Sequence, residues 1–338
     1  MNRKKALITG ISGQDGSYLA ELLISKGYKV FGVVRKTSSQ NHPNLDHIQS
    51  KLNLIYGDLI DQSLLNNVIT QVKPDEVYNL AAQSSPADSF KQQFHTAEIT
   101  GIGAHRLFES VRQFAPKAKV YQASSSEMFG WVKEIPQDEN TPFNPANPYA
   151  AAKLYAHTMA KIYRESYNMF ISCGILFNHE SARRGMGFVT QKVTYAAACA
   201  KLGIRTSHLL NEVGSPILKD NRLALGNLDA KRDWGSAEDF VQAMWLILQQ
   251  KRPDDFVVAT SDTHTIRELC QEAFSYIGLN WKNYVYVDKR LVRPTETGPL
   301  IGDYKKIRKV IGWKPKTRFK GLIAQMVDAH LNALTQKK

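Results

Sequence analysis

The sequence is poor in cysteine, with three in 338 residues. They lie far apart and none belongs to a CxxC pair, so the pattern favours neither a structural zinc site nor a disulfide framework, which is rare in cytosolic proteins. We therefore expect no metal site. We interpret the three thiols as packing residues: Cys173, Cys199 and Cys270.

Long apolar runs are also missing. No run approaches the roughly 20 residues that a membrane-spanning helix needs, and the polar start of the chain leads into a short strand-like segment without a signal-peptide core. We therefore expect a cytoplasmic protein with no membrane partner. Hydrophobic residues make up 43% and charged residues 22% of the chain, which is typical of a globular fold.

Positive charge is in excess, but the sequence has no basic block. The formal net charge is +13, with Lys and Arg spread along the chain. Nucleic-acid-binding arms concentrate their basic residues instead. The charge therefore favours small anionic ligands, and we expect no nucleic-acid partner.

The first half alternates between strand-like and helical patterns, which predicts an α/β fold with a doubly wound parallel sheet. Right-handed crossovers then place helices on both faces of that sheet. The predicted strands cover residues 6–9, 30–34, 53–56, 76–80, 119–123 and 170–176, and the predicted helices cover 17–26, 64–71, 103–114 and 149–167.

After Leu176 the pattern is less regular and predicts a smaller α/β lobe. Helical patterns cover 190–202, 237–250 and 265–277, a strand covers 256–259, and a polar segment runs to Gly226. Two basic helical stretches close the chain. We predict a sheet domain at 1–177, to which the chain returns at about 229–260, and a second lobe at 178–228 and 261–338.

Gly10, Gly13 and Gly16 follow the first strand and open the first helix. Glycines at this place in a Rossmann-like fold permit a tight turn and a close approach to a pyrophosphate, which the helix N-terminus attracts. The segment, with Gln14 and Asp15 inside it, therefore predicts a dinucleotide cofactor.

The end of the second strand indicates which cofactor. NAD sites usually have an acid there that binds the ribose 2′-hydroxyl. This sequence has no acid but Arg35 and Lys36, which are suited to a 2′-phosphate and favour NADP. Further cofactor contacts are expected where the third and fourth strands end, at Asp58, Leu59, Ala81, Ala82 and Gln83.

Tyr149 and Lys153 are four residues apart in a helical segment, so they share one face. The ammonium group, together with the positive nicotinamide ring of the cofactor, is expected to lower the pKa of the tyrosine. The tyrosine then removes a hydroxyl proton while hydride leaves the same carbon. Ser125, where the fifth strand ends, is expected to hold that hydroxyl. Glu127 supplies a base that a simple oxidation does not need but an elimination of water does.

Three motifs resemble those of the extended short-chain dehydrogenase/reductase family: residues 10–16, residues 124–127, and Tyr149 with Lys153. Longer segments are more specific and look like the GDP-mannose 4,6-dehydratase branch of that family, and the likeness extends over nearly the whole chain. Those segments are residues 9–21, 79–84, 174–181 and 231–235.

The resemblance implies NADP-dependent dehydration of a GDP-sugar, with GDP-mannose the first expectation. Hydride leaves C4, Glu127 removes the C5 proton as water leaves from C6, and hydride returns to C6. Arg232 and Arg293 would hold the diphosphate, and Glu296 would accept from the nucleotide ribose. The implied substrate contacts are Ser84, Asn178, Glu180, Arg184, Lys192, Arg232, Arg293 and Glu296.

Two segments depart from the family's pattern. The stretch 201–226 is longer than expected and either reshapes the sugar pocket or forms an inert surface loop. Residues 37–43 lack the aromatic residue and the further arginine of a loop that joins subunits around the cofactor. A homodimer through the long helices is therefore expected at least as much as the family's homotetramer.

Several alternatives stay open. The substrate is alternatively a GDP-linked heptose or N-acetylhexosamine. A 4-keto reductase or epimerase of the same fold would keep Tyr149 and Lys153 without needing Glu127. A nucleotide-binding regulator is disfavoured by the intact catalytic set, and an RNA-binding protein by the lack of clustered basic and aromatic motifs.

Overall fold

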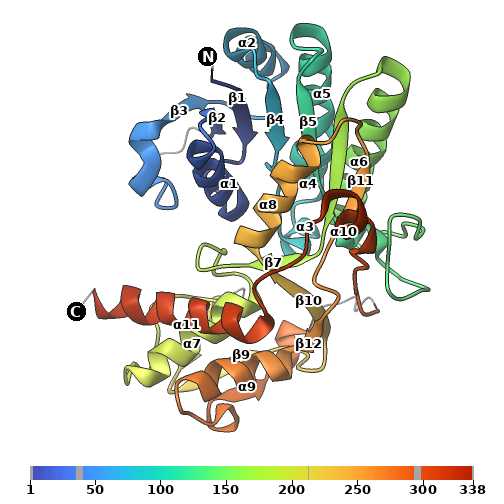
Figure 1. Cartoon of the computed structure of the whole chain (residues 1–338). Coiled ribbons are helices and arrows are strands. Elements are labelled where there is room, and N and C mark those ends of the chain that lie inside the picture. Colours follow the sequence, from blue (N-terminus) through green and yellow to red (C-terminus); the bar gives the residue numbers. More distant parts are fainter. Residues whose placement is uncertain (1–2, 36–40, 212, 293–297, 337–338) are drawn as a thin grey trace.

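The computed structural model describes residues 3–35, 41–211, 213–292 and 298–336 (Figure 1). Its largest sheet has seven strands, all parallel, which confirms the predicted doubly wound α/β fold. In spatial order they are β3 (Leu52–Tyr56), β2 (Lys29–Val34), β1 (Lys5–Thr9), β4 (Glu76–Asn79), β5 (Lys119–Ser125), β6 (Ile171–Leu176) and β11 (Asp255–Val258).

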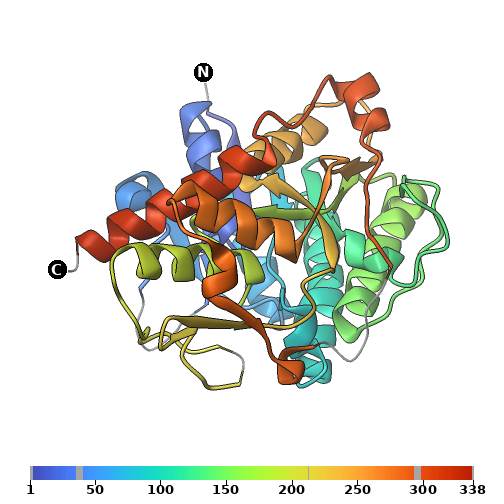
Figure 2. The ribbon, with the colours of Figure 1, turned by 90° about the horizontal axis from the view of Figure 1, so that it is seen from below.

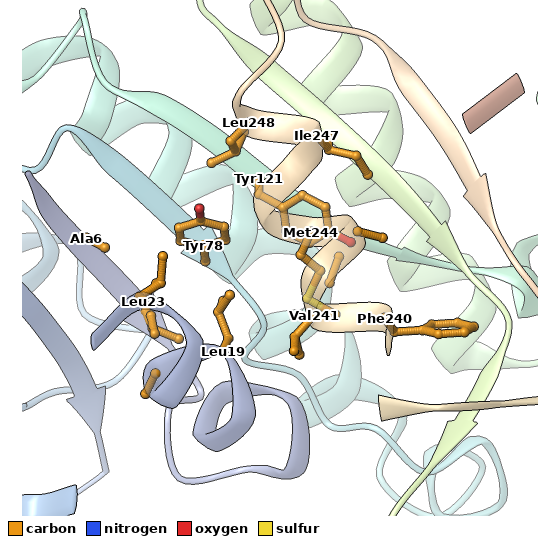
Figure 3. Packing of buried hydrophobic residues seen from close by; sticks show 14 of the residues in the cluster. Ala6, Leu19, Leu23, Tyr78, Tyr121, Phe240, Val241, Met244, Ile247 and Leu248 are labelled. Carbon is orange, nitrogen blue, oxygen red and sulfur yellow. The ribbon is translucent and has the colours of Figure 1, made fainter. Parts of the chain in front are cut away.

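Helices cover both faces of this sheet, so its strands are apolar on both sides. Within β1, Ala6 and Ile8 belong to the core beneath α1 (Gln14–Ser25) and α8 (Ala237–Leu248), whereas Leu7 belongs to the opposite core. Figure 3 shows the first of these cores, with Leu19 and Leu23 of α1 and Met244 of α8. On the opposite face lie α2 (Gln62–Val72), α5 (Gly103–Phe114) and α6 (Pro148–Tyr167).

Local signals explain where α6 begins and ends. The side chain of Asn147 caps its N-terminus by accepting from the Ala150 N–H, and Pro148 occupies the first helical position, where no N–H is needed. Asn168 ends the helix with a φ of 53°, in the left-handed region that asparagine tolerates. The predicted helix at 149–167 therefore differs from the observed one by a single residue.

The second half forms two three-stranded sheets and three helices that share a separate core. The helices are α7 (Val189–Lys201), α9 (Ile266–Tyr276) and α11 (Phe319–Thr335), which lie below the large sheet in Figure 1 and side by side in Figure 2. One sheet contains β7 (Asn178–Glu180), β10 (Lys231–Ser236) and β12 (Thr263–Thr265), and the other contains β8 (Leu218–Lys219), β9 (Arg222–Leu225) and β13 (Val285–Val287).

The division of the chain into two domains stays a prediction, but the strand pairing is informative. β10 lies inside the segment expected to return to the large sheet, yet it pairs with β7 and β12. Only α8 and β11 of that segment join the large sheet. Trp234 of β10 is buried and stacks on Phe319.

The segment 201–226 is not an inert surface loop. It contains a hairpin of β8 and β9, whose Leu218 and Leu223 are buried in the second core. The turn residues Asp220 and Asn221 have φ values of 50° and 62°, the backbone of a two-residue hairpin turn. The sequence pattern did not reveal these strands because β8 and β9 have only two and four residues.

The cysteines, the length of the helices and the shorter elements complete the description of the fold. All three cysteines are buried and unpaired, as expected of packing residues. No helix in the described part of the chain is long and apolar enough to cross a membrane. The remaining helices are α3 (Pro86–Ser89), α4 (Gln93–Thr96) and α10 (Lys305–Ile311), with a π-helical turn at Ala97–Ile102 and 3-10 turns at Asp46–Lys51, Ser126–Phe129, Trp281–Asn283 and Lys289–Leu291.

Candidate active site

The glycine loop between β1 and α1 leaves no room for side chains at two positions. Gly10 has a φ of +71°, and a Cβ atom there would lie 2.9 Å from the backbone of Ala81. A Cβ atom at Gly16 would lie 2.3 Å from the carbonyl oxygen of Gly10. Gly13, at the N-terminus of α1, is less crowded. The loop and the open end of α1 therefore fit the phosphates of a dinucleotide.

Gln14 and Asp15, predicted to bind the cofactor, direct their side chains toward the second half of the chain. Gln14 donates to the His179 carbonyl oxygen at 3.1 Å and accepts from Ser181 at 2.9 Å. Asp15 bonds to His179, with 2.8 Å between Oδ2 and Nε2. Their side chains thus attach α1 to β7, and only their backbone N–H groups belong to the helix end that faces the phosphates.

His179 is buried between two acceptors. Its Nδ1 lies 2.7 Å from the Phe177 carbonyl oxygen and its Nε2 lies 2.8 Å from Asp15, so both ring nitrogens must donate and the ring is an imidazolium. Burial alone would lower the pKa of His179, but the charge and the hydrogen bond of Asp15 raise it above its ordinary value. Burial likewise opposes ionisation of Asp15, yet His179, Gln14 and Arg184 together lower its pKa to about 2.

The other residues predicted to bind the cofactor lie at the carboxyl ends of β2, β3 and β4. Arg35 is exposed directly after β2, and Asp58 is half-buried after β3. Leu59 is buried in the core, where it packs beside Gly103. After β4, the Ala81 N–H donates to Thr9 and the Gln83 N–H donates to Thr100, and Ala82 lies between them. Lys36 lies outside the described residues.

The four predicted catalytic residues come from β5, the turn after it and α6. Tyr149, Lys153 and Ser125 are nearly fully buried, and Glu127 is half-buried. Lys153 donates to the Ala123 carbonyl oxygen at 2.7 Å, and its Nζ lies 5.8 Å from the centre of the Tyr149 ring. Burial has the largest effect on the pKa of Tyr149 and raises it; Ser125 lowers this pKa, and the charge of Glu127 raises it.

Lys153 alone does not lower the pKa of Tyr149, and the lower pKa expected with a positive nicotinamide ring beside it stays a prediction. Burial raises the pKa of the phenol to about 12, and Ser125 and the charge of Arg184 oppose the shift. Burial also lowers the pKa of Lys153 to about 8. The physical reason is desolvation, which disfavours both charged side chains and which the spacing of two residues in a helix does not reveal.

The sequence reasoning missed Asn147. Its Nδ2 donates to Oε2 of Glu127 at 2.9 Å, while its Oδ1 accepts from the Ala150 N–H at 2.8 Å. An asparagine before a proline at the start of a helical pattern is a recognisable capping signal. Its contact with Glu127, 20 residues away, follows only from the fold.

The described residues that were predicted to contact the substrate come from several different elements. Glu180 is buried and accepts from Thr190 at 2.7 Å, and its carboxylate lies 3.3 Å from the Arg184 Nε atom. Asn178 opens β7 opposite Trp234, which places Arg232 two residues away along β10. Lys192 is buried in α7, and Ser84 is exposed after β4. Arg293 and Glu296 lie outside the described residues.

The charge pair of Asp15 and His179 predicts a pH-dependent stability. The pKa of His179 is raised on folding, so its contribution is complete below the unfolded value of about 6.5 and is lost as pH rises through the folded value. Asp15 contributes above its unfolded pKa, and its part is lost as pH falls toward about 2. We expect His179→Gln to cost about 3–5 kcal/mol between pH 5 and 6 and less at alkaline pH, in denaturant unfolding.

The matched control is His95→Gln, because His95 is exposed. It should leave the free energy of unfolding and its pH dependence close to those of the wild type. A difference between wild type and His179→Gln that stays constant from pH 5 to alkaline pH would contradict a charged His179.

The site can now be compared with known proteins. A model of the GDP-mannose 4,6 dehydratase family matches residues 7–326. GDP-mannose 4,6 dehydratase 1 of Arabidopsis thaliana is 48% identical, over 99% of this chain and 92% of the plant protein. The GDP-mannose 4,6 dehydratase of Homo sapiens is 44% identical, over 98% of this chain and 92% of the human protein.

A solved structure agrees with the fold. The dTDP-glucose 4,6-dehydratase of Bacillus anthracis, in complex with NAD, has a TM-score of 0.81 and 21% identity, over 97% of each chain. At this identity the likeness establishes the arrangement of sheet and helices alone. The family match and the two closer relatives extend over most of the sequence. The chain belongs to the GDP-mannose 4,6 dehydratase family.

Proposed function

We propose that this protein catalyses the NADP-dependent 4,6-dehydration of a GDP-sugar, with GDP-mannose as the substrate to test first. Membership of the family supports the reaction and the substrate. The observation that carries the proposal within the structure is Glu127. Its carboxylate accepts a hydrogen bond at 2.9 Å from Asn147, two residues before Tyr149, so a carboxylate and a phenol lie at the same end of α6.

Each of the four residues has a role in this reaction. The nicotinamide of the bound cofactor supplies the chemistry that accepts a hydride from C4 of the hexose and returns it to C6. Tyr149 takes the proton of the C4 hydroxyl, and Ser125, nearly fully buried at the end of β5, holds that hydroxyl. Lys153, fixed by the Ala123 carbonyl oxygen, supplies positive charge on the same helix face.

Glu127 accounts for the elimination. The resulting C4 ketone acidifies the C5–H bond, and the carboxylate takes that proton while the electron pair forms a C5–C6 double bond. The C6–O bond breaks, and the departing hydroxide takes the proton from Glu127 and leaves as water. C5 later takes a proton derived from solvent as C6 is reduced, which yields a 4-keto-6-deoxy sugar. A 4-keto reductase would have no use for this carboxylate.

Replacement of Glu127 should separate oxidation from elimination. We expect Glu127→Gln to lower the rate of product formation by about 10²–10⁴-fold, because a positioned base contributes that much. C4 oxidation should persist in a single turnover, visible as reduced nicotinamide. To measure this, the protein is incubated with GDP-mannose in D₂O, and deuterium at C5 is followed by NMR and mass spectrometry.

Glu134→Gln is the control, because Glu134 is an exposed carboxylate in the loop that follows the turn of Glu127. If the wild type forms the 4-keto-6-deoxy product without incorporating deuterium at C5, the proposed elimination step is wrong. If it acts only on a GDP-heptose or a GDP-linked N-acetylhexosamine, the reaction stands and the choice of sugar is wrong.

NADP is proposed over NAD because of the end of β2. Arg35 is exposed there, and β2 is not followed by an acid at that position. A guanidinium pairs with a 2′-phosphate through charge-assisted hydrogen bonds, which contribute about 1.5–3 kcal/mol each. We expect Arg35→Ala to weaken NADP⁺ binding about tenfold or more and to leave NAD⁺ binding nearly unchanged, measured by calorimetry. Equal losses for both cofactors would contradict the assignment.

We also propose a homodimer formed through α5 and α6. The outer surface of these helices exposes large apolar side chains, which are unusual on a monomer's surface when they gather. They are Phe114 of α5 and Tyr155, Ile162 and Tyr167 of α6, with Ile102 in the turn just before α5. We expect light scattering to give twice the monomer mass for the wild type, and Tyr155→Glu with Ile162→Glu to shift it toward the monomer. A monomeric wild type at micromolar concentration would contradict this interface.

A further inference from the structure

A single side-chain amide joins the two halves of the catalytic apparatus. Nδ2 of Asn147 donates to Oε2 of Glu127 at 2.9 Å, and Oδ1 of the same amide accepts from the Ala150 N–H at 2.8 Å. Glu127 belongs to the short turn after β5, whereas Ala150 belongs to the first turn of α6.

The orientation of this amide is determined by its partners. A backbone N–H only donates, so the atom that faces Ala150 must be the oxygen. The NH₂ group therefore faces the carboxylate, and it only donates. A flipped amide would oppose its oxygen to the carboxylate and its NH₂ group to the backbone N–H.

The hydrogen bond from Asn147 involves one of the two carboxylate oxygens of Glu127. Within the described residues, Asn147 is the side chain that donates to this carboxylate, through Oε2, and Oε1 accepts no hydrogen bond. The turn that carries Glu127 is itself held by Ser125, whose Oγ accepts from the Glu127 N–H at 3.2 Å. One carboxylate oxygen is thus fixed, and the other is available for a proton.

Asn147 also lies at the helix end that positions Tyr149. It is the N-cap residue of α6, and Pro148 and Tyr149 are the first two residues of the helix. Any displacement of Asn147 relative to this helix end would break the bond to the Ala150 N–H. Asn147 therefore fixes the position of the Glu127 carboxylate relative to the Tyr149 phenol. This matters because an error of about 1 Å can cost about 100-fold in rate.

We propose that Asn147 is a positioning residue that holds Glu127 for removal of the C5 proton. The inference rests on the proposed function, because it concerns the elimination step. The competing explanation is that Asn147 only caps α6. Capping and positioning can be separated, because aspartate and serine cap a helix about as well as asparagine but cannot give the same donor to Glu127.

The decisive variant is Asn147→Asp, which keeps the shape and the cap but puts a negative charge where the donor was. We expect Tm close to that of the wild type and C4 oxidation within about threefold in a single turnover. Deuterium incorporation at C5 should slow by about 10–100-fold, so that reduced nicotinamide accumulates. Asn147→Ser should show the same pattern to a smaller extent, and Asn147→Ala should lower Tm as well.

Asn144→Asp is the matched control, because Asn144 is exposed in the same loop and donates to the Trp131 carbonyl oxygen. It should change neither step. An Asn147→Asp variant with wild-type deuterium incorporation, or with both steps slowed equally and a lower Tm, would show a capping role alone and overturn the inference. A wild type that forms no 4-keto-6-deoxy product from any GDP-sugar overturns the proposed function, and the inference with it.

Discussion

The arrangement of the site depends on an ion pair between Asp15, half-buried in the first turn of α1, and the buried His179 of β7. The two bonds of Gln14 to the same segment reinforce it. A carboxylate beside the phosphate-binding end of a helix would repel a pyrophosphate, and the imidazolium neutralises it. The same contact fixes the start of the second half of the chain against the cofactor loop. Loss of either partner would leave a buried charge without compensation.

The topology explains why the remaining groups meet where they do. The order of strands reverses at β1, with β2 and β3 on one side and β4, β5 and β6 on the other. In open parallel sheets, ligands bind at the carboxyl ends of the strands beside such a reversal. The glycine loop follows β1, the turn with Glu127 follows β5, and α6 brings Tyr149 beside that turn. Asn147 then connects the turn to the helix with one amide.

Much of the fold could be predicted because its signals are local and long. The strands of the large sheet appear as apolar runs because both faces are covered, and α6 carries a cap at each end. The hairpin at Leu218–Leu225 was missed because its strands are short, although Asp220 and Asn221 are suited to its turn. Without a nicotinamide ring beside it, the pKa of Tyr149 is raised, since burial by residues distant in the chain outweighs a lysine one turn away.

The sequence by itself determined the glycine turn, the missing acid after β2 and the shared helix face of Tyr149 and Lys153. Each depends on backbone geometry or helical period within a few residues, which neighbouring residues specify. Only the tertiary structure decided that Asp15 pairs with His179, 164 residues later, and that Asn147 holds Glu127. Such pairs form because the packing of the whole chain brings distant segments within hydrogen-bonding distance and excludes water, and no local pattern encodes which partners will meet.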